Sequence, residues 1–307
     1  MRYAIITDIH ANYTALRAVD NDVRRLRAVS DEPIDYWFLG DLVGYGPQPV
    51  ECVRWLRYTS RVGARWVAGN HDEWFILPDG KVHPDALASL SRHQALLNEP
   101  ENQELGTWFC DEVRSTTQAA INGEEPRSLV AESWDGLTAL FVHGSAVLGM
   151  RRGTYLYPWD TMTLVDEFQR LAKRDKQADE TLVLFCGHTH YPMWARYTPT
   201  GDVRLQSIKY RQSTPLGEGL MIISPGSVGQ PRDGDPRAAY LLFNPQAKTV
   251  EFRRVEYEIE ETVAALESDD HYPPSLAARL RSANGGLNGQ EFARVYQRPE
   301  WDLEAME

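Results

Sequence analysis

The sequence of 307 residues predicts a protein of the α/β class. Two observations lead to this prediction. Apolar, strand-like runs alternate with segments of helical periodicity near the start of the chain, and closely spaced strand-like runs fill much of the second half. The alternation implies parallel strands joined by right-handed crossovers, and the short later connections imply antiparallel pairing. We therefore expect a parallel sheet segment followed by a second, mostly antiparallel one.

The first part of the chain alternates three strands with two helices. The runs at 3–8, 35–41 and 65–70 are apolar and stop at polar residues, which is typical of buried strands. The segment 13–29 carries apolar residues on one helical face. The segment 47–59 begins with proline, which suits the first turn of a helix, and continues with apolar residues at helical spacing.

The middle of the chain interrupts this alternation. Residues 72–127 are polar and contain helix-like patches, so we expect a helical insertion there. Strands resume at 128–134 and 137–144. We expect these two strands to form a hairpin that turns at Asp135-Gly136.

The second half is rich in strands. After a helix at 159–174, six strand-like runs follow in close order, which suggests a second, mostly antiparallel sheet. The tail 259–307 begins with helical patterns and becomes glycine-rich. We therefore expect one domain over residues 1–258 and a helical to irregular tail over 259–307.

Composition and charge exclude several classes of protein. The net charge of −12 argues against a protein that coats nucleic acid or binds an anionic membrane, because such partners attract basic surfaces. The three cysteines are far apart and odd in number, so we expect no disulfide framework and a cytoplasmic location. A strand begins at once, which leaves no room for a signal peptide, and no apolar run has the length of a membrane span.

Side chains that commonly bind metal follow the strand-like runs where each run ends. In an open α/β sheet, ligands bind outside the carboxyl ends of the strands, so these side chains could converge. Five of the eight histidines belong to this set, whereas His83, His93 and His271 lie in polar stretches and are expected to be solvated. The set comprises Asp8, His10, Asp41, Asn70, His71, His143, His188 and His190.

Each of these residues alone has an ordinary explanation. An aspartate such as Asp8 commonly caps a helix, Asn70 suits a turn, and a single histidine such as His143 commonly belongs to the core. The joint pattern is far more specific. The blocks D-x-H, GD, GNHD, H and GH-x-H occur in this order, and each follows a strand-like run.

This order of blocks resembles the calcineurin-like metallophosphoesterases, over roughly residues 3 to 245. The stretches DIHANYTAL and PGSVGQPRDGDPRAAY look like the small bacterial and archaeal phosphodiesterase branch. The large protein phosphatases of the family carry an arginine soon after the GD block, and GDLVGYGP carries none. The resemblance implies an α/β/β/α sandwich of two mixed sheets flanked by helices. It also implies hydrolysis of a phosphoester, with a phosphodiester favoured.

The resemblance further implies two divalent transition-metal ions. Asp8, His10 and His190 would hold the first ion, and Asp41 would bridge both. Mixed oxygen and nitrogen ligands suit Mn²⁺, Fe, Zn²⁺ or Ni²⁺ better than Ca²⁺ or Mg²⁺. Two divalent ions outweigh the two aspartates, so the site attracts a phosphate even in an acidic protein.

The second ion would be held by Asn70, His143 and His188. By the same resemblance, His71 would bind no metal; it would stabilise the phosphoryl oxygens or protonate the leaving group. Asp72 could orient His71, although a carboxylate at the start of a helix explains it equally well. The implied reaction is direct attack of a metal-bridging hydroxide on phosphorus, without a covalent intermediate.

The substrate stays open at this level. A phosphomonoester or a dinucleoside polyphosphate would also fit, and a non-catalytic, metal-binding interaction scaffold of the same fold is the alternative from another class. The presence of His71 and of all seven candidate ligands favours catalysis. We expect a small phosphorylated substrate and neither a polynucleotide nor a membrane as partner.

Other residues have simpler explanations than function. Arg151 and Arg152 could reach a phosphate, but a solvated pair explains them. Arg232 and Asp233 are expected to build turns. Asn12 could touch substrate or cap the helix at 13–29. An aromatic set could line a pocket for a nucleobase or aryl group, with packing as the simpler explanation: Trp74, Phe75, Tyr155, Tyr157 and Trp159.

Overall fold

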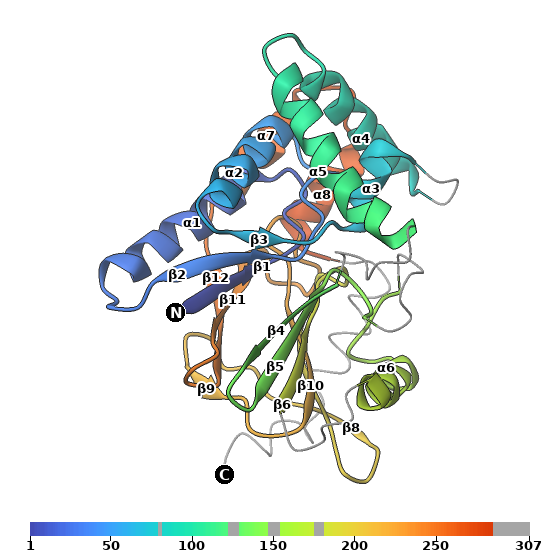
Figure 1. The fold of residues 1–307 in the computed structure, drawn as a ribbon. Helices are drawn as coiled ribbons and strands as arrows, with labels where there is room; N and C mark the ends of the chain where they lie inside the picture. The colour runs from blue at the N-terminus through green and yellow to red at the C-terminus, as the bar shows by residue number, and fades with distance from the viewer. Residues whose placement is uncertain (79–81, 122–128, 147–153, 175–180, 285–307) are drawn as a thin grey trace.

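Two six-stranded sheets lie face to face in the computed structural model (Figure 1). The first sheet has the strand order β3-β2-β1-β11-β12-β9. Strands β1, β2 and β3 are parallel, and β11 pairs antiparallel with β1. The sheet contains β1 (Arg2–Ile6), β2 (Ile34–Phe38), β3 (Arg65–Trp66), β9 (Thr214–Pro215), β11 (Ala238–Asn244) and β12 (Thr249–Val255). The structure describes residues 1–78, 82–121, 129–146, 154–174 and 181–284.

The second sheet has the strand order β4-β5-β6-β10-β7-β8. Strands β5, β6 and β10 are parallel neighbours, whereas the other pairs are antiparallel. The expected hairpin at Asp135-Gly136 is confirmed between β4 and β5. The sheet contains β4 (Leu129–Trp134), β5 (Leu137–Val142), β6 (Thr181–Phe185), β7 (Pro192–Tyr197), β8 (Val203–Leu205) and β10 (Leu220–Pro225).

Helices cover the outer faces of both sheets (Figure 1). α1 and α2 pack on the first sheet, and α6 packs on the second. The expected helical segment after residue 72 consists of α3, α4 and α5. The helices in the described residues are α1 (Tyr13–Ala28), α2 (Pro49–Arg61), α3 (Asn70–Ile76), α4 (Pro84–Leu97), α5 (Gln103–Ile121), α6 (Thr161–Arg174), α7 (Ile259–Glu267) and α8 (Pro274–Ser282).

The alternation of side chains along each strand builds these layers. In β1, Ala4 and Ile6 face the helices of the first outer layer, whereas Tyr3 and Ile5 face the second sheet. On the far side, Phe168 of α6 is fully buried against the outer face of the second sheet. Fully burying an apolar side chain of this size stabilises a fold by about 1.5–3 kcal/mol. The layer order is therefore α/β/β/α, which confirms the predicted fold class.

Two assignments made from the sequence are wrong. β11 and β12 do not join the second sheet; they continue the first sheet beyond β1. Periodicity identifies a strand but not its partner, because both inner faces bury the same kinds of side chain. Without those two strands, the second sheet is mixed rather than mostly antiparallel. The third strand is also shorter than expected, since β3 ends at Trp66.

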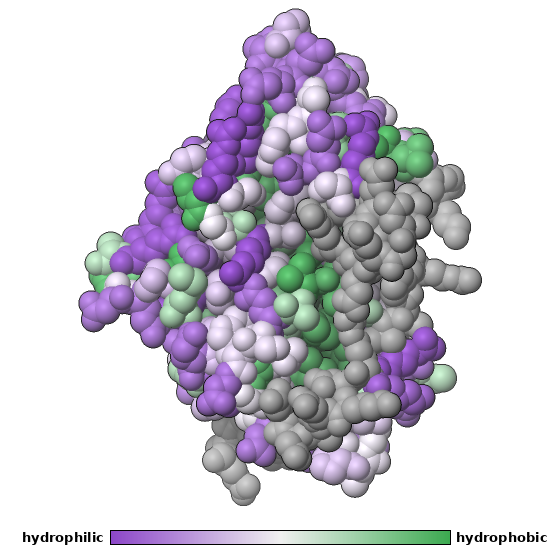
Figure 2. All heavy atoms as spheres, viewed as in Figure 1, coloured by the Kyte–Doolittle hydropathy of each residue, from purple (hydrophilic) through white to green (hydrophobic). Residues whose placement is uncertain are grey.

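The carboxyl ends of β1, β2, β5 and β6 lie at one edge of the sandwich, where their following loops meet. The C-terminal helices α7 and α8 pack around Tyr45 close to this edge. On the face drawn in Figure 2, hydrophilic residues cover most of the helical end of the molecule. Among the described helices, none is both long and apolar enough to cross a membrane.

Candidate metal centre

The loops at this edge hold their polar residues in an unusual backbone conformation. Five of them adopt the left-handed region, with φ between 48° and 68°. This region is sparsely populated by residues other than glycine, although aspartate and histidine tolerate it better than most. Hydrogen bonds fix the loops: Asp8 N donates to Gly40 O at 3.0 Å and His10 N to Asp41 O at 2.9 Å. The five residues are Asp8, His10, Asp41, His188 and His190.

Two glycines are required here because other groups approach closely. A Cβ atom at Gly187 would collide with Thr7 Oγ1 on the neighbouring β1 loop, so the glycine allows the two strand ends to meet. A Cβ atom at Gly44, which has φ of +91°, would collide with the ring of His71. Both glycines therefore make room for site residues.

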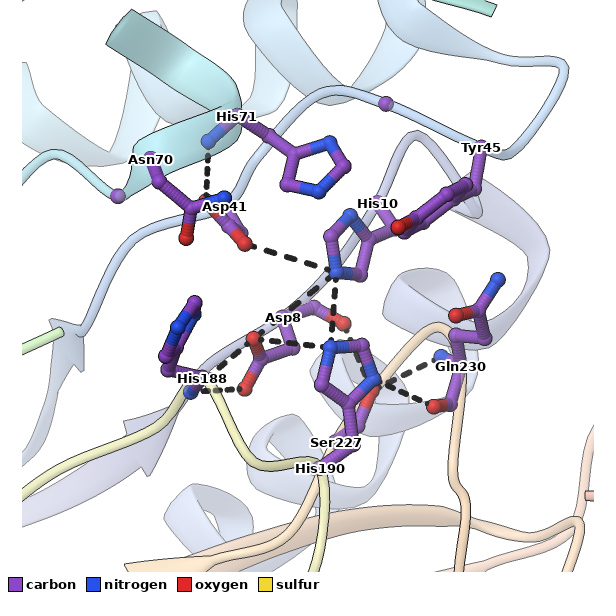
Figure 3. Close-up of polar contacts among 12 residues, drawn as sticks. Asp8, His10, Asp41, Tyr45, Asn70, His71, His188, His190, Ser227 and Gln230 are labelled. Carbon is purple, nitrogen blue, oxygen red and sulfur yellow. Dashed lines mark hydrogen bonds and ion pairs between the residues drawn. The ribbon is translucent and has the colours of Figure 1, made fainter. Parts of the chain in front are cut away.

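The first cluster consists of Asp8, His10 and His190 (Figure 3). The Nε2 atoms of the two histidines lie 3.2 Å apart, and Asp8 Oδ1 lies 3.4 Å from His190 Nε2. Each ring donates its Nδ1–H to a backbone carbonyl, of Val43 at 3.1 Å and of Gln230 at 2.6 Å. These bonds select the tautomer that leaves a lone pair on each Nε2, pointing into the cluster.

The second cluster consists of Asn70, His143 and His188. His143 Nε2 lies 3.1 Å from Asn70 Oδ1 and 3.2 Å from His188 Nδ1. The Nδ1–H of His143 donates to Leu39 O at 2.7 Å, which again turns the lone pair of Nε2 toward its neighbours. Two ligands bound at 2.0–2.1 Å to a tetrahedral ion lie about 3.3 Å apart, so both clusters match the donor spacing around one cation.

Asp41 lies between the two clusters. Its Oδ2 is 3.7 Å from His10 Nε2 and 3.2 Å from His143 Nε2. Its Oδ1 accepts a hydrogen bond from the backbone N of His71 at 2.8 Å. One carboxylate oxygen therefore faces nitrogen donors of both clusters, and the other is held by α3.

The ring of His71 lies beside the clusters, opposite His190 in the close-up view (Figure 3). Its centroid is 4.7 Å from that of His10 and 4.6 Å from that of Tyr45. One of its ring nitrogens lies within 4.8 Å of donor atoms of His10 and Asp41. Its Nδ1 is buried and has no hydrogen-bond partner among the described residues. This buried Nδ1 lies against Gly44, while the ring as a whole borders both clusters.

Burial and mutual charge shift the pKa values of the clusters. Burial raises the pKa of Asp8 to about 7. For His143 burial acts downward, but the Asp41 carboxylate outweighs it and raises the pKa to about 10. Burial lowers the pKa of His71 to about 4. Protons on Asp8 and His143 would thus offset the buried negative charge, and a metal ion bound at the site would displace them.

Asp72 fixes the loop after β2 rather than the ring of His71. Its Oδ2 accepts hydrogen bonds from Asp41 N and Gly69 N, each at 2.9 Å, and its Oδ1 accepts from Leu42 N at 2.8 Å. Of the two suggested roles of Asp72, the structure therefore favours the carboxylate at the start of a helix, where it binds backbone N–H groups. These hydrogen bonds set the position of Asp41.

His93 was expected to be solvated, and this is wrong. It is fully buried on α4, where its Nδ1 accepts from Gly44 N at 3.2 Å and its Nε2–H donates to Gly46 O at 2.7 Å. Ser89 Oγ accepts from Tyr45 N at 2.8 Å, so α4 holds three consecutive loop residues. The helical spacing of His93 from Leu90 and Leu97, which are both buried, was the signal for its burial. The polar residues around His93 in the sequence obscured this signal.

The remaining candidates have mixed outcomes. Asn12 caps α1 by accepting from Ala15 N at 3.1 Å. Arg151 and Arg152 lie outside the described residues. Arg232 was expected to build a turn; its guanidinium donates to the side chain of Gln230, whose backbone carbonyl holds His190. Arg232 lies in the stretch PGSVGQPRDGDPRAAY, but its relation to the site depends on the fold.

The aromatic candidates do not form one open surface. Tyr155 stacks on His188 at 3.9 Å with one face and on Tyr157 at 5.1 Å. Trp74 packs against His71 at 5.1 Å. Phe75 belongs to the core, where it contacts Phe109 at 5.5 Å. Tyr155 and Trp74 therefore support site histidines, while Phe75 has a packing role.

Comparison with known proteins identifies the family. The family model described as calcineurin-like phosphoesterase superfamily domain matches residues 1–248. A metallophosphoesterase structure from Sphaerobacter thermophilus shares 30% sequence identity and a TM-score of 0.66, covering 92% of this chain and 100% of that one. A hypothetical protein from Pyrococcus horikoshii, PH1004, has 17% identity and a TM-score of 0.66, and so shows a similar fold.

Two relatives are found by sequence. The chain is 29% identical over 283 residues to uncharacterized protein MJ0912 of Methanocaldococcus jannaschii, which covers 90% of this chain and 96% of that protein. A symmetrical bis(5'-nucleosyl)-tetraphosphatase of Psychromonas ingrahamii is 32% identical over 105 residues, about a third of each chain. The family match spans most of the chain and includes all the site blocks. The chain therefore belongs to the calcineurin-like phosphoesterase superfamily and is a hydrolase that acts on phosphoester bonds.

Proposed function

We propose that this chain is a dinuclear metal-dependent phosphohydrolase that cleaves a small phosphoester, with a phosphodiester favoured. The observation that carries the proposal is that Asp41 Oδ2 faces both His10 Nε2, at 3.7 Å, and His143 Nε2, at 3.2 Å. A carboxylate in this position offsets the repulsion between two neighbouring cations. The mixture of imidazole, carboxylate and amide donors supports Mn²⁺, Fe²⁺, Zn²⁺ or Ni²⁺.

In this proposal, the first cluster would hold one ion, the second cluster would hold the other, and Asp41 would bridge them. When bound, the ions would supply a water of lowered pKa and positive charge for the phosphoryl oxygens. The chain contributes rigid ligands, because backbone carbonyls orient His10, His143 and His190 through their Nδ1–H groups.

His71 is proposed as the catalytic residue outside the ligand set. Its ring lies against His10 and Tyr45, and one of its ring nitrogens lies within 4.8 Å of donor atoms of His10 and Asp41. His71 would hydrogen-bond a phosphoryl oxygen or donate a proton to the leaving group.

The test is a metal-supplemented assay of the purified chain. Bis(p-nitrophenyl) phosphate and p-nitrophenyl phosphate would be compared with Mn²⁺, Zn²⁺ and Ni²⁺, before and after treatment with a chelator. We expect hydrolysis of the diester to be faster, to stop on chelation and to return with metal. A folded protein that binds two ions but cleaves neither ester, nor any of a panel of nucleotides, would instead be a metal-binding scaffold.

A second candidate substrate is a dinucleoside polyphosphate. It is motivated by the relative from Psychromonas ingrahamii that is named a bis(5'-nucleosyl)-tetraphosphatase. Diadenosine tetraphosphate belongs in the nucleotide panel for this reason. A kcat/KM for it above that of the simple diester would replace the phosphodiester assignment.

We also propose a cytoplasmic enzyme with a small soluble substrate. The net charge of −12 supports this, since polynucleotides and anionic membranes repel such a surface. The three cysteines are free, and Cys52 and Cys186 are buried, as suits a reducing compartment. Localisation of a tagged chain by cell fractionation checks this.

A further inference from the structure

Arg232 belongs to a loop that is fastened directly to the first cluster. This loop follows β10, and its Ser227 Oγ donates to Asp8 O at 2.9 Å. Gln230 accepts from His190 Nδ1 through its backbone carbonyl at 2.6 Å, as Figure 3 shows. The side-chain Oε1 of the same Gln230 accepts from Arg232 Nη2 at 3.0 Å. Gln230 therefore binds His190, a candidate metal ligand, through its backbone carbonyl and Arg232 through its side chain.

The guanidinium of Arg232 lacks an acidic partner among the described residues. The two carboxylates nearest in sequence are engaged elsewhere: Asp233 pairs with Arg254, and Asp235 pairs with Arg237 at 2.6 Å. Among the described residues, Arg232 makes one hydrogen bond, to a neutral amide, although a guanidinium has five N–H donors. Burying a cation without an acidic partner costs free energy, so a contribution to the stability of the fold does not explain the position of Arg232.

The hydrogen-bond partner of Arg232 lies at the site itself. Gln230, which accepts from Arg232, lines a small cavity together with His10 and Tyr45. Because the same Gln230 also holds His190, the guanidinium is placed next to the first cluster.

Two tyrosines pack against histidines of the site. Tyr45 lies 4.8 Å from His10 and 4.6 Å from His71, measured between ring centroids. Tyr155 stacks on His188 at 3.9 Å. Arg232 interacts electrostatically with both phenol groups. The guanidinium is thus close to aromatic side chains that pack against histidines of both clusters.

We propose that Arg232 is a phosphate-binding residue, whose guanidinium binds a non-bridging oxygen of the substrate's phosphoryl group beside the two clusters. The inference rests on the proposed function and identifies the chain's own anion-recognising cation for it. The planar guanidinium suits paired phosphoryl oxygens, and the bond to Gln230 limits its rotation. Lysine would retain the charge without this geometry.

The test measures binding of inorganic phosphate to the metal-loaded chain by isothermal titration calorimetry. Arg232→Met should raise the Kd for phosphate by about 10- to 100-fold, the usual effect of losing a hydrogen bond to a charged group. Arg232→Lys should fall between wild type and Arg232→Met. The matched control is Arg237→Met, which removes an exposed arginine of the same loop and should leave the Kd unchanged.

Metal content and turnover are measured on the same samples. Retained metal together with weaker phosphate binding supports the proposal. An unchanged Kd in Arg232→Met overturns it, and so does loss of metal from that variant, since Arg232 would then only support His190. If wild type cleaves no ester but still binds phosphate through Arg232, the proposed function fails while this inference stands.

Discussion

The Nε2 atoms of His10 and His190 face each other at 3.2 Å, and both rings donate through Nδ1 to backbone carbonyls. Each Nε2 therefore carries a lone pair rather than a proton in the neutral ring. Two lone pairs at this separation repel each other unless a cation lies near both. We therefore expect both Nε2 atoms to bind the same cation.

The two clusters should lose their ions separately. His190→Ala should remove mainly the ion of the first cluster, and His188→Ala mainly the ion of the second, so each variant should hold about one ion instead of about two. Elemental analysis of dialysed protein measures this. His83→Ala is the control, because the side chain of His83 is 62% exposed and pairs with Asp85 outside both clusters. Loss of both ions from either single change would show that the clusters bind cooperatively.

His71→Ala should separate catalysis from metal binding. We expect kcat to fall by about 10²- to 10⁴-fold, the usual contribution of a general acid or base, while the metal content stays at the wild-type level. One ring nitrogen of His71 lies within 4.8 Å of the donors of His10 and Asp41, so metal content must be measured beside turnover. Loss of an ion in this variant would reassign His71 as a ligand.

Affinity for metal should rise with pH. With protons as the only cations, the pKa of His143 is raised to about 10 and that of Asp8 to about 7. Both groups must be deprotonated to bind metal, so affinity falls as pH drops below each value. Near pH 8 the Kd for Mn²⁺ should change by about tenfold per pH unit, and more steeply below pH 7. Calorimetry in buffers of different ionisation enthalpy measures the protons released; a Kd independent of pH would contradict the prediction.

His93 should make stability depend on pH. Burial lowers its pKa from 6.5 to about 3, so between these values the unfolded chain binds more protons than the folded chain. Stability must therefore fall as pH decreases below 6.5, by about 1.4 kcal/mol from this residue between pH 7.5 and 5.5. His93→Gln keeps a donor and an acceptor but does not titrate. Chemical denaturation should show a smaller loss for this variant over the same range; equal losses would mean that other groups carry the effect.

The site could be predicted from the sequence because its residue types are rare and follow strands. Asp8, Asp41 and His143 each come directly after an apolar run, so the edge of the sheet that gathers them follows from chain direction. The structure brings all eight predicted residues together, and the resemblance to a family supplied the division into two clusters. Their roles as ligands stay a prediction.

Other features could not be predicted because they depend on long-range packing. The pairing of β11 with β1 joins segments more than two hundred residues apart, and no local pattern specifies it. His93 looked solvated because its neighbours in sequence are polar, although its partners Gly44 and Gly46 lie on another loop. Arg232 lies next to the site only because the loop after β10 folds against the first cluster. The need for Gly187 likewise arises from a distant segment, since Thr7 leaves no room for a side chain there.

The left-handed backbone at Asp8, His10 and Asp41 also has a kinetic consequence. Hydrogen bonds within the folded chain already enforce this conformation, so its strain, of order 1–3 kcal/mol per residue, arises during folding and not during metal uptake. An arriving ion then meets ligands that need little rearrangement. The rate of loading should accordingly follow how readily each ion sheds its water shell, which makes exchange of Mn²⁺ faster than that of Ni²⁺.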